Sequence, residues 1–249
     1  MTEFKIRLAD KTVAISAMFE TTRRYCEQYL TDSDDVDVSV AVTPDDLTYE
    51  REKSEREQTP EEFARLTDNL LELTAVYRKI AEAFVDFGIL LFHGSCVCVD
   101  GEAFIFSARS GTGKSTHTRL WRELFGERCI MINDDKPLIE VKDGDVRVWG
   151  TPWNGKHRLS TNTSAPLRAI CILERAAENS IRPQSMLAVF PEIFSQTYRF
   201  ADADKMRTTL VLLEKTLNGV GLFRLGCNMD ISAAEVAYNG MKGRDQNEA

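Results

Sequence analysis

The sequence predicts an α/β protein in which a small N-terminal α/β region, residues 1–88, precedes a larger unit over residues 89–249. Short alternating runs with acidic turns fill the first forty residues, whereas apolar strands around a glycine-rich loop follow residue 89. A strongly periodic helical pattern over residues 60–87 separates these two regions. The order strand, glycine-rich loop, helix and strand is typical of an α/β core.

The composition excludes several classes of protein. The 249 residues are 43% hydrophobic and 28% charged, and 31 basic against 39 acidic side chains leave a formal net charge of −8. This charge disfavours non-specific binding to nucleic acid. No apolar run is long enough to span a bilayer, and the start "MTEFKIRLADKTV" lacks the apolar block of a signal peptide. We therefore expect a cytoplasmic protein that binds neither nucleic acid nor membrane, with its scattered cysteines reduced and mostly buried. No feature sets an oligomeric state.

The N-terminal region is expected to hold a few strands and one helix over residues 18–30. The charged segment 43–60 has no apolar face, which favours an exposed loop. Thr59, Pro60 and Glu62 then form a helix start, and apolar residues three or four positions apart extend the pattern to residue 87. A single copy of such a stripe favours a core helix over a coiled coil.

The remaining chain alternates strands with helices. Two hairpins are expected, with Asp-Gly turns at residues 100–101 and 143–144. A helix should run from residue 113 to about 124, and strands should cover 128–134 and 168–175. From Met186 on, the chain should be mostly helical, with Ser232 and Glu235 as a capping box of the last helix.

The stretch "SGTGKST" predicts a phosphate-binding loop between a strand and a helix. Its glycines allow the backbone to approach an anion, Lys114 suits the outer phosphates and Ser115 suits Mg²⁺. We expect it to bind ATP, or another nucleoside triphosphate, with Mg²⁺ through Ser110, Gly111, Thr112, Gly113, Lys114, Ser115 and Thr116. Ala108 occupies the first glycine position of the motif, which a negative φ would tolerate. The alternative is a glycine-rich turn that binds nothing.

Two adjacent aspartates end the strand after this helix. Asp134 and Asp135 follow the apolar run "CIMIN", and we expect their strand to lie beside the strand that leads into the loop. Both carboxylates can reach one site only if the chain turns at the strand end, and Pro137 indicates a nearby turn. A solvated acidic turn is the alternative, although it fits poorly after an apolar strand. His93, taken alone, is more typical of a structural histidine.

The combination "HGSCVCVDGEAFIFSARSGTGKS…INDD" resembles the catalytic core of the HPr kinase/phosphorylase family, whose nucleotide-binding fold is shared with the phosphoenolpyruvate carboxykinases. The resemblance covers about residues 90–140. It implies a P-loop core of this type with a mixed sheet and a helical C-terminal part. It also implies that Lys114 and Ser115 bind phosphate and Mg²⁺, and that Lys114 takes part in catalysis. By the same resemblance, Asp134 would be the base facing the acceptor hydroxyl, Asp135 a metal-side carboxylate and His93 a charge partner of the base. The loop that engages HPr and the regulatory domain of that family are not found.

The stretch "TPWNGKHR" admits two interpretations. Lys156 and Arg158 suit a substrate-side loop that grips a phosphate or carboxylate, whereas a basic hairpin turn with a packing Trp153 explains the same residues. The sequence as a whole favours a kinase that transfers the γ-phosphate of ATP to a serine-type hydroxyl of a peptide, protein or small molecule. A non-catalytic nucleotide-binding regulatory module is the alternative, since it needs no base. A carboxykinase-like decarboxylation is a third reading, although the chain has only three histidines.

Overall fold

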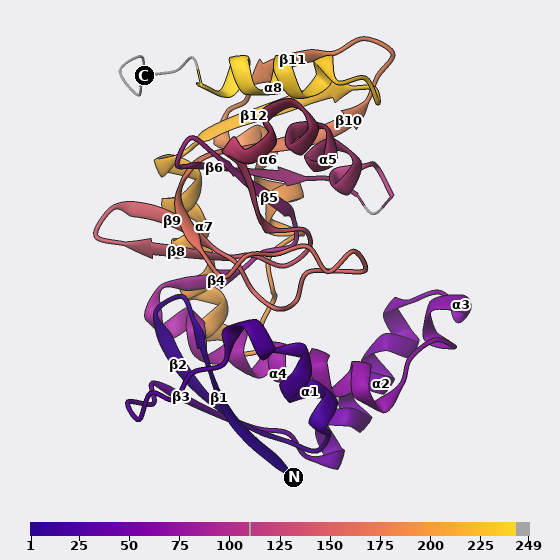
Figure 1. Cartoon of the computed structure of the whole chain (residues 1–249), viewed down its shortest axis with the longest axis vertical. Coiled ribbons are helices and arrows are strands. Elements are labelled where there is room, and N and C mark those ends of the chain that lie inside the picture. The colour runs from indigo at the N-terminus through magenta and orange to yellow at the C-terminus, as the bar shows by residue number, and fades with distance from the viewer. Residues whose placement is uncertain (110, 243–249) are drawn as a thin grey trace. The chain divides into compact units, whose positions relative to one another are not determined.

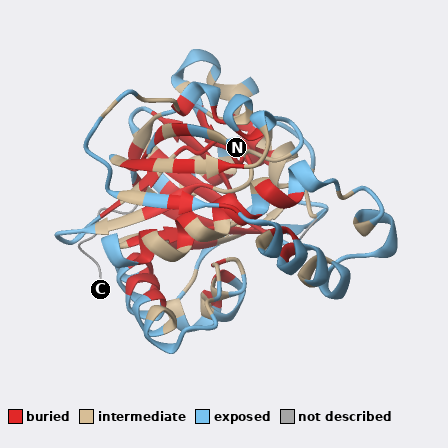
Figure 2. Cartoon of the chain, turned by 90° about the horizontal axis from the view of Figure 1, so that it is seen from below, coloured by how far each residue is buried: buried red, intermediate tan, exposed pale blue. Residues whose placement is uncertain are grey.

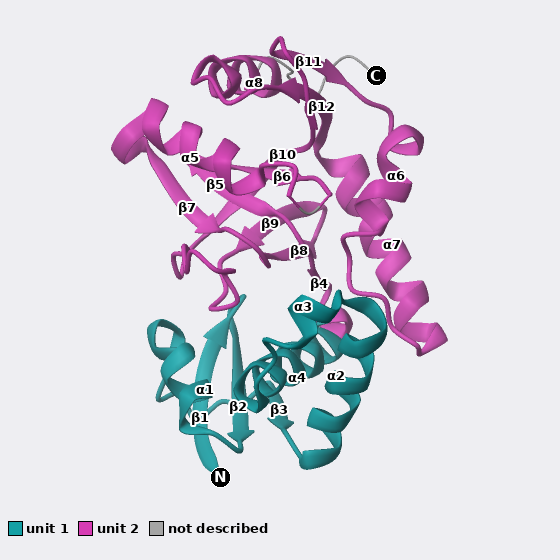
Figure 3. Cartoon of the chain, turned by 90° about the vertical axis from the view of Figure 1, so that its right-hand side faces the viewer, with its two compact units in different colours: residues 1–84 teal, residues 85–249 magenta. Residues whose placement is uncertain are grey.

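The computed structural model describes residues 1–109 and 111–242, and the chain divides into two compact units (Figure 3). Unit 1 is Met1–Phe84 and unit 2 is Val85–Ala249. The division therefore falls after Phe84, slightly before the boundary at residue 88 that we expected. Each unit has its own sheet, and the two are described separately below.

Unit 1 consists of a three-stranded sheet and several helices (Figure 1). Its strands are β1 (Thr2–Leu8), β2 (Lys11–Ala17) and β3 (Val38–Ala41), with β1 antiparallel and β3 parallel to β2. Its helical elements are α1 (Glu20–Tyr25), η1 (Glu27–Tyr29), α2 (Pro44–Glu57), α3 (Pro60–Phe63) and α4 (Asp68–Phe84). Alternate residues of the hairpin, Ile6, Val13 and Ile15, are buried.

The continuous helix expected over residues 60–87 is wrong, because the chain breaks between α3 and α4. The Oγ1 of Thr67 accepts a hydrogen bond from the N–H of Leu70 at 3.4 Å, and its carbonyl accepts one from Leu71 at 3.0 Å. Thr67 thus starts a second helix. The apolar period runs on across the break, so periodicity alone did not reveal it.

The loop expected over residues 43–60 is also wrong, because this segment forms α2. Thr43 and Asp46 make a capping box at its N-terminus. Arg78 of α4 binds Asp46 at 3.0 Å and Glu50 at 2.5 Å, and the side chain of Glu50 is only 2% exposed. Ion pairs with a neighbouring helix therefore replace the apolar face whose absence suggested a loop.

Unit 2 is built on a mixed sheet, as expected for the fold class. In the part of the chain that the structure describes, its strands follow the order β4-β8-β9-β10-β6-β5-β7, with β12 pairing β10 and β11 pairing β12. Strand β10 runs parallel to β6 and β12 and antiparallel to β9. The strands are β4 (Ile89–Leu91), β5 (Ser95–Val99), β6 (Glu102–Ser107), β7 (Cys129–Asn133), β8 (Leu138–Lys142), β9 (Asp145–Trp149), β10 (Ser164–Arg175), β11 (Ser180–Pro183) and β12 (Gly221–Cys227).

Both expected hairpins are present, with β5–β6 turning at residues 100–101 and β8–β9 at 143–144, all four with positive φ. Two other expectations about unit 2 fail. Strand β7 pairs with β5 rather than with β6. Since β5 is antiparallel to both, β6 and β7 still run in the same direction and end at one edge of the sheet. The second failure is the capping box, because the side chain that accepts a backbone N–H at the start of the last helix is Asp230, from Ser232 at 2.9 Å. The part after Met186 is mostly helical, as expected, with β12 between α7 and α8.

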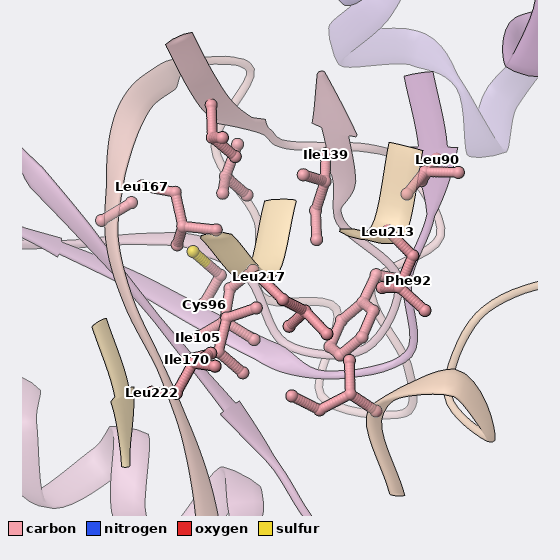
Figure 4. Packing of buried hydrophobic residues seen from close by; sticks show 14 of the residues in the cluster. Leu90, Phe92, Cys96, Ile105, Ile139, Leu167, Ile170, Leu213, Leu217 and Leu222 are labelled. Carbon is pink, nitrogen blue, oxygen red and sulfur yellow. The ribbon is translucent and has the colours of Figure 1, made fainter. Parts of the chain in front are cut away.

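Helices cover both faces of the unit 2 sheet. They are η2 (Val85–Phe87), α5 (Lys114–Phe125), η3 (Gly126–Arg128), α6 (Met186–Phe194), α7 (Ala203–Gly219) and α8 (Ser232–Lys242). Strand β6 shows the alternation that makes two cores: Ile105 packs among residues of α6 and α7, whereas Phe104 packs among residues of α5 and α8. Figure 4 shows the first of these clusters around Phe92 and Leu213.

Buried residues lie in the strands and on the helix faces that pack against them, as the red segments of Figure 2 show. The six cysteines are free, and Cys26, Cys96, Cys98 and Cys171 are buried. Among the described residues, no helix combines the length and the apolar character needed to cross a membrane.

Candidate active site

The phosphate-loop sequence forms an open turn between β6 and α5. Gly111 and Gly113 have φ of +76° and +126°, backbone angles that residues other than glycine rarely adopt. Gly113 is the N-cap of α5 and no side chain caps this end. The N–H groups of the first turn are therefore left for an anion, which the helix dipole also favours. Ser110, expected to be part of this loop, lies outside the described residues.

Ala108, at the first glycine position, fits without backbone strain. It does not have a positive φ, and it is buried in the cluster of Phe106 and Trp121. Its carbonyl accepts a hydrogen bond from the Nζ of Lys114 at 3.2 Å. Burial lowers the pKa of Lys114, although the charges of Asp135 and Asp134 oppose this shift. The ammonium group of Lys114 therefore lies close enough to both carboxylates for their charges to affect its pKa.

Asn133 turns the chain so that both aspartates reach one site. Its Oδ1 accepts the N–H of Asp135 at 2.8 Å and that of Lys136 at 2.6 Å. Its Nδ2 donates to the carbonyl and hydroxyl oxygens of Thr151, each at 3.0 Å. This side-chain turn ends β7 at the point where the alternation of the strand would have separated the carboxylates. The expected turn is present, and its cause is Asn133.

Asp134 is a buried carboxylate with one oxygen held. The hydroxyl of Ser95, on β5, lies 3.0 Å from Asp134 Oδ1 and 3.0 Å from its carbonyl oxygen. The other carboxylate oxygen, Oδ2, has no hydrogen-bond partner in the part of the chain that is described. The side chain also lines the cavity defined below. Asp134 therefore presents one fixed and one available oxygen.

Asp135 lies beside a histidine and a lysine. Its Oδ1 lies 3.2 Å from His93 Nε2, and its Oδ2 lies 3.8 Å from Lys136 Nζ. Burial alone would raise the pKa of Asp135, but His93, Lys136 and Lys114 outweigh burial and hold the pKa below its usual range. His93 was expected to be the partner of Asp134. The structure instead pairs His93 with Asp135, because Gly94 donates to the Asp135 carbonyl at 2.9 Å and fixes His93 beside it.

The segment "TPWNGKHR" passes over Asp135. A Cβ built on Gly155 (φ +68°) would lie 3.1 Å from the Asp135 Cβ, so this position requires glycine on two counts. Trp153 is buried, which agrees with the packing role considered for it. Lys156 lines the cavity at Asp135, whereas Arg158 is exposed and does not line it.

These segments enclose a cavity of about 330 Å³. It is lined by His93, Gly111, Gly113, Lys114, Ser115, Thr116, Asp134, Asp135, Gly155, Lys156 and His157. Of the described residues predicted from sequence, only Thr112 and Arg158 are absent from this lining. Sequence reasoning missed Ser95, Asn133 and His157. An Asn directly before the aspartates was a usable turn signal, whereas nothing marked Ser95 or His157.

The residues of this cavity fit a magnesium–nucleotide. Uncapped N–H groups and Lys114 suit phosphate oxygens, and the Ser115 hydroxyl with the ionised Asp135 suits Mg²⁺, which is commonly held by one or two carboxylates together with substrate phosphates. Among the described residues, no group of three or more His, Cys, Asp or Glu side chains could hold a metal by itself. Any Mg²⁺ here would therefore take its remaining ligands from phosphate oxygens and water.

No protein-family model matches the chain, and no curated protein matches it in sequence. Among solved structures, the chain is similar to the Hpr(Ser) kinase/phosphatase from Coxiella burnetii, with a TM-score of 0.33 and 8% identity. That match covers 61% of this chain and 99% of the other. At this TM-score the likeness supports no statement about the site, whose interpretation rests on the geometry above.

Proposed function

We propose that the protein is an ATP-dependent phosphotransferase that transfers the γ-phosphate to a serine-type hydroxyl of a peptide, protein or small molecule. The observation that carries this proposal is the single cavity shared by Lys114 and Ser115 of the loop with Asp134 and Asp135 of the neighbouring strand end. The mixed sheet and the strand–loop–helix unit support a P-loop core of the carboxykinase and HPr kinase type.

The two carboxylates have different surroundings, which supports different roles. His93, Lys136 and Lys114 hold the pKa of Asp135 below its usual range, so this carboxylate is ionised, as a magnesium-side carboxylate should be. Asp134 keeps an oxygen available toward the cavity while Ser95 fixes the other, which suits a general base. We assign His93 to Asp135 as an orienting partner, so His93 acts on the metal-side carboxylate.

The reaction then divides among the residues as follows. Asp134 Oδ2 takes the proton of the acceptor hydroxyl as its oxygen forms the new bond to phosphorus. Lys114 and the N–H groups of the loop neutralise the charge that develops on the phosphate oxygens. Bound Mg·ATP supplies the phosphoryl group, and its β–γ bridging bond breaks to release ADP. Asp134 finally returns its proton to solvent.

Lys156 lies at the acceptor side of the cavity in this scheme. It is exposed and shares the cavity with the aspartates, so it can attract an acidic group of the acceptor. We propose a peptide or protein hydroxyl in preference to free serine or another metabolite. Because the chain carries a net charge of −8, a nucleic-acid acceptor is disfavoured.

The test is to incubate the full chain with γ-labelled ATP and Mg²⁺ beside peptides, HPr, free serine and a metabolite extract. The proposal expects label in a hydroxyl acceptor, and it expects Asp134→Asn to bind ATP normally while losing transfer by at least about 100-fold. Label only in small molecules would overturn the preference for peptides. ATP binding without transfer in either protein would favour a regulatory module, and no ATP binding would refute the proposal altogether.

A further inference from the structure

A second cavity, of about 470 Å³, borders the same phosphate loop. It shares Gly111, Gly113 and Thr116 with the first cavity. Its other walls come from Thr112, from His117 of α5 and from residues at and just after the ends of β10 and β12. The first cavity is completed by residues beside the start of β5, by residues after the end of β7 and by the segment 155–157. In the sheet, β10 and β12 lie on one side of β6, and β5 and β7 lie on the other. The two cavities therefore flank the loop.

The second cavity lies at the edge of the sheet where ligands bind in open α/β folds. Strands β6, β10 and β12 are parallel, so Ser107, Arg175 and Cys227 end at the same edge. Ligands in such sheets occupy crevices outside the carboxyl ends of the strands. Its volume lies in the range of ordinary small-molecule sites.

The chemistry of the two cavities differs. The first is lined by carboxylates, lysines and histidines, whereas the second is lined in part by Ala176, Cys227 and Met229. Met229 is 78% exposed, so a large apolar side chain stands at the surface with little of it buried. Thioethers make favourable contacts with aromatic rings, and a flat ring in this cavity would bury Met229.

His117, which also lines the second cavity, carries an unused polar atom. It is 2% exposed, and its Nε2 accepts a hydrogen bond from Trp121 Nε1 at 3.0 Å. Burial lowers the pKa of His117 to about 4, so the ring is neutral near pH 7 and its proton resides on Nδ1. This buried Nδ1 has no hydrogen-bond partner in the part of the chain that is described. An unpaired buried donor is costly, and an acceptor atom on a ligand would satisfy it.

We propose that the second cavity is the nucleoside subsite of the nucleotide whose phosphates the loop binds, with the base packed against Met229. This inference rests on the proposed function. A base in this cavity fixes the orientation of the nucleotide, because the triphosphate then extends across the loop from Met229 toward Asp134 and Asp135. The terminal phosphate is thereby delivered to the carboxylates.

Arg175, which also lines this cavity, acts as a positioning residue for the loop. Its Nη2 donates to the Gly111 carbonyl at 2.6 Å and its Nε donates to the Thr112 carbonyl at 3.4 Å. These bonds hold the loop backbone and are independent of any base. Loss of Arg175 should therefore weaken every ligand that the loop binds, with or without a nucleoside.

The experiment compares Mg·ATP with Mg·tripolyphosphate, which has the phosphates and no nucleoside, by calorimetry on the full chain. Met229→Ala should weaken ATP binding about tenfold and leave tripolyphosphate binding unchanged, and Met229→Leu should restore most of the loss. Ala176→Trp, at an exposed position, should fill the cavity and weaken ATP binding by more than about tenfold with the same selectivity. Arg175→Ala should weaken both ligands.

Equal effects of Met229→Ala and Ala176→Trp on the two ligands, or no effect of either on ATP, would overturn the subsite. Equal affinity of the wild-type chain for the two ligands would do the same. Lys114→Ala separates the two proposals, because it should weaken both ligands. If it weakens neither, the proposed function fails. If it weakens both while the Met229 and Ala176 variants change nothing, only the nucleoside subsite fails.

Discussion

Asn133→Ala should cost unit 2 about 3 kcal/mol of stability and disable the site. Asn133 is fully buried and takes part in hydrogen bonds of 3.0, 3.0, 2.8 and 2.6 Å with Thr151, Asp135 and Lys136. At about 0.5–1.5 kcal/mol for each of these four bonds, their loss amounts to about 2–6 kcal/mol. The same bonds orient both aspartates, so transfer should fall about 100-fold while ATP affinity changes little.

Urea unfolding followed by tryptophan fluorescence reports the stability of unit 2, because all three tryptophans, Trp121, Trp149 and Trp153, lie in that unit. With a denaturant slope of about 2 kcal/mol per molar, the midpoint should fall by about 1.5 M. Asn218→Ala, at an exposed position of α7, is the matched control and should shift stability by less than about 0.5 kcal/mol. If Asn133→Ala unfolds at the same midpoint as this control, the assigned role of Asn133 is wrong.

Three further predictions concern the surroundings of the carboxylates. Gly155→Ala and Gly144→Ala both place a side chain on a residue with positive φ, and each should lower the free energy of unfolding in urea by about 1–2 kcal/mol. Only the new Cβ at Gly155 would contact Asp135, so only Gly155→Ala should lose transfer, and equal transfer by the two variants would contradict this. Lys156→Ala should raise the KM for an acidic acceptor several-fold and Arg158→Ala should not, because only Lys156 lines the cavity; steady-state kinetics that rank them oppositely would exclude Lys156. The lowered pKa of Asp135 stabilises unit 2 above about pH 4, where the carboxyl of the unfolded chain is ionised, and this stabilisation is lost as the pH falls through the lower pKa of the folded state. Asp135→Asn should therefore flatten the acid side of the stability–pH curve measured by urea unfolding, and an unchanged curve would refute the assignment.

The features that local chemistry dictates could be predicted from the sequence. Asp-Gly pairs marked both hairpins of unit 2 because type I′ turns need two residues with positive φ. The glycines and Lys114 marked the phosphate loop for the same kind of reason. Strand ends were readable wherever an apolar run met a polar cluster, which is how Asp134 and Asp135 were found.

Features that depend on a partner distant in the sequence could not be read in this way. Helix α2 owes its packing to Arg78, which lies in another helix, so its own residues showed no buried face. The order of strands is decided by long-range pairing, and the sequence offered no reason for β5 to separate β6 from β7. His93 was assigned to the wrong aspartate because two adjacent carboxylates are distinguished only by the turn at Asn133.

The most direct test of the account is whether the loop and the carboxylates bind one magnesium–nucleotide. Calorimetric titration of ATP into the full chain, with and without Mg²⁺, measures this. We predict that Mg²⁺ tightens ATP binding to the wild-type chain and to the control Asp143→Asn, in a hairpin turn away from the cavity. In Asp135→Asn, the Mg²⁺-free affinity should persist while the tightening by Mg²⁺ falls about tenfold or more. Full Mg²⁺ enhancement in Asp135→Asn, or no ATP binding by the wild-type chain, would contradict the account.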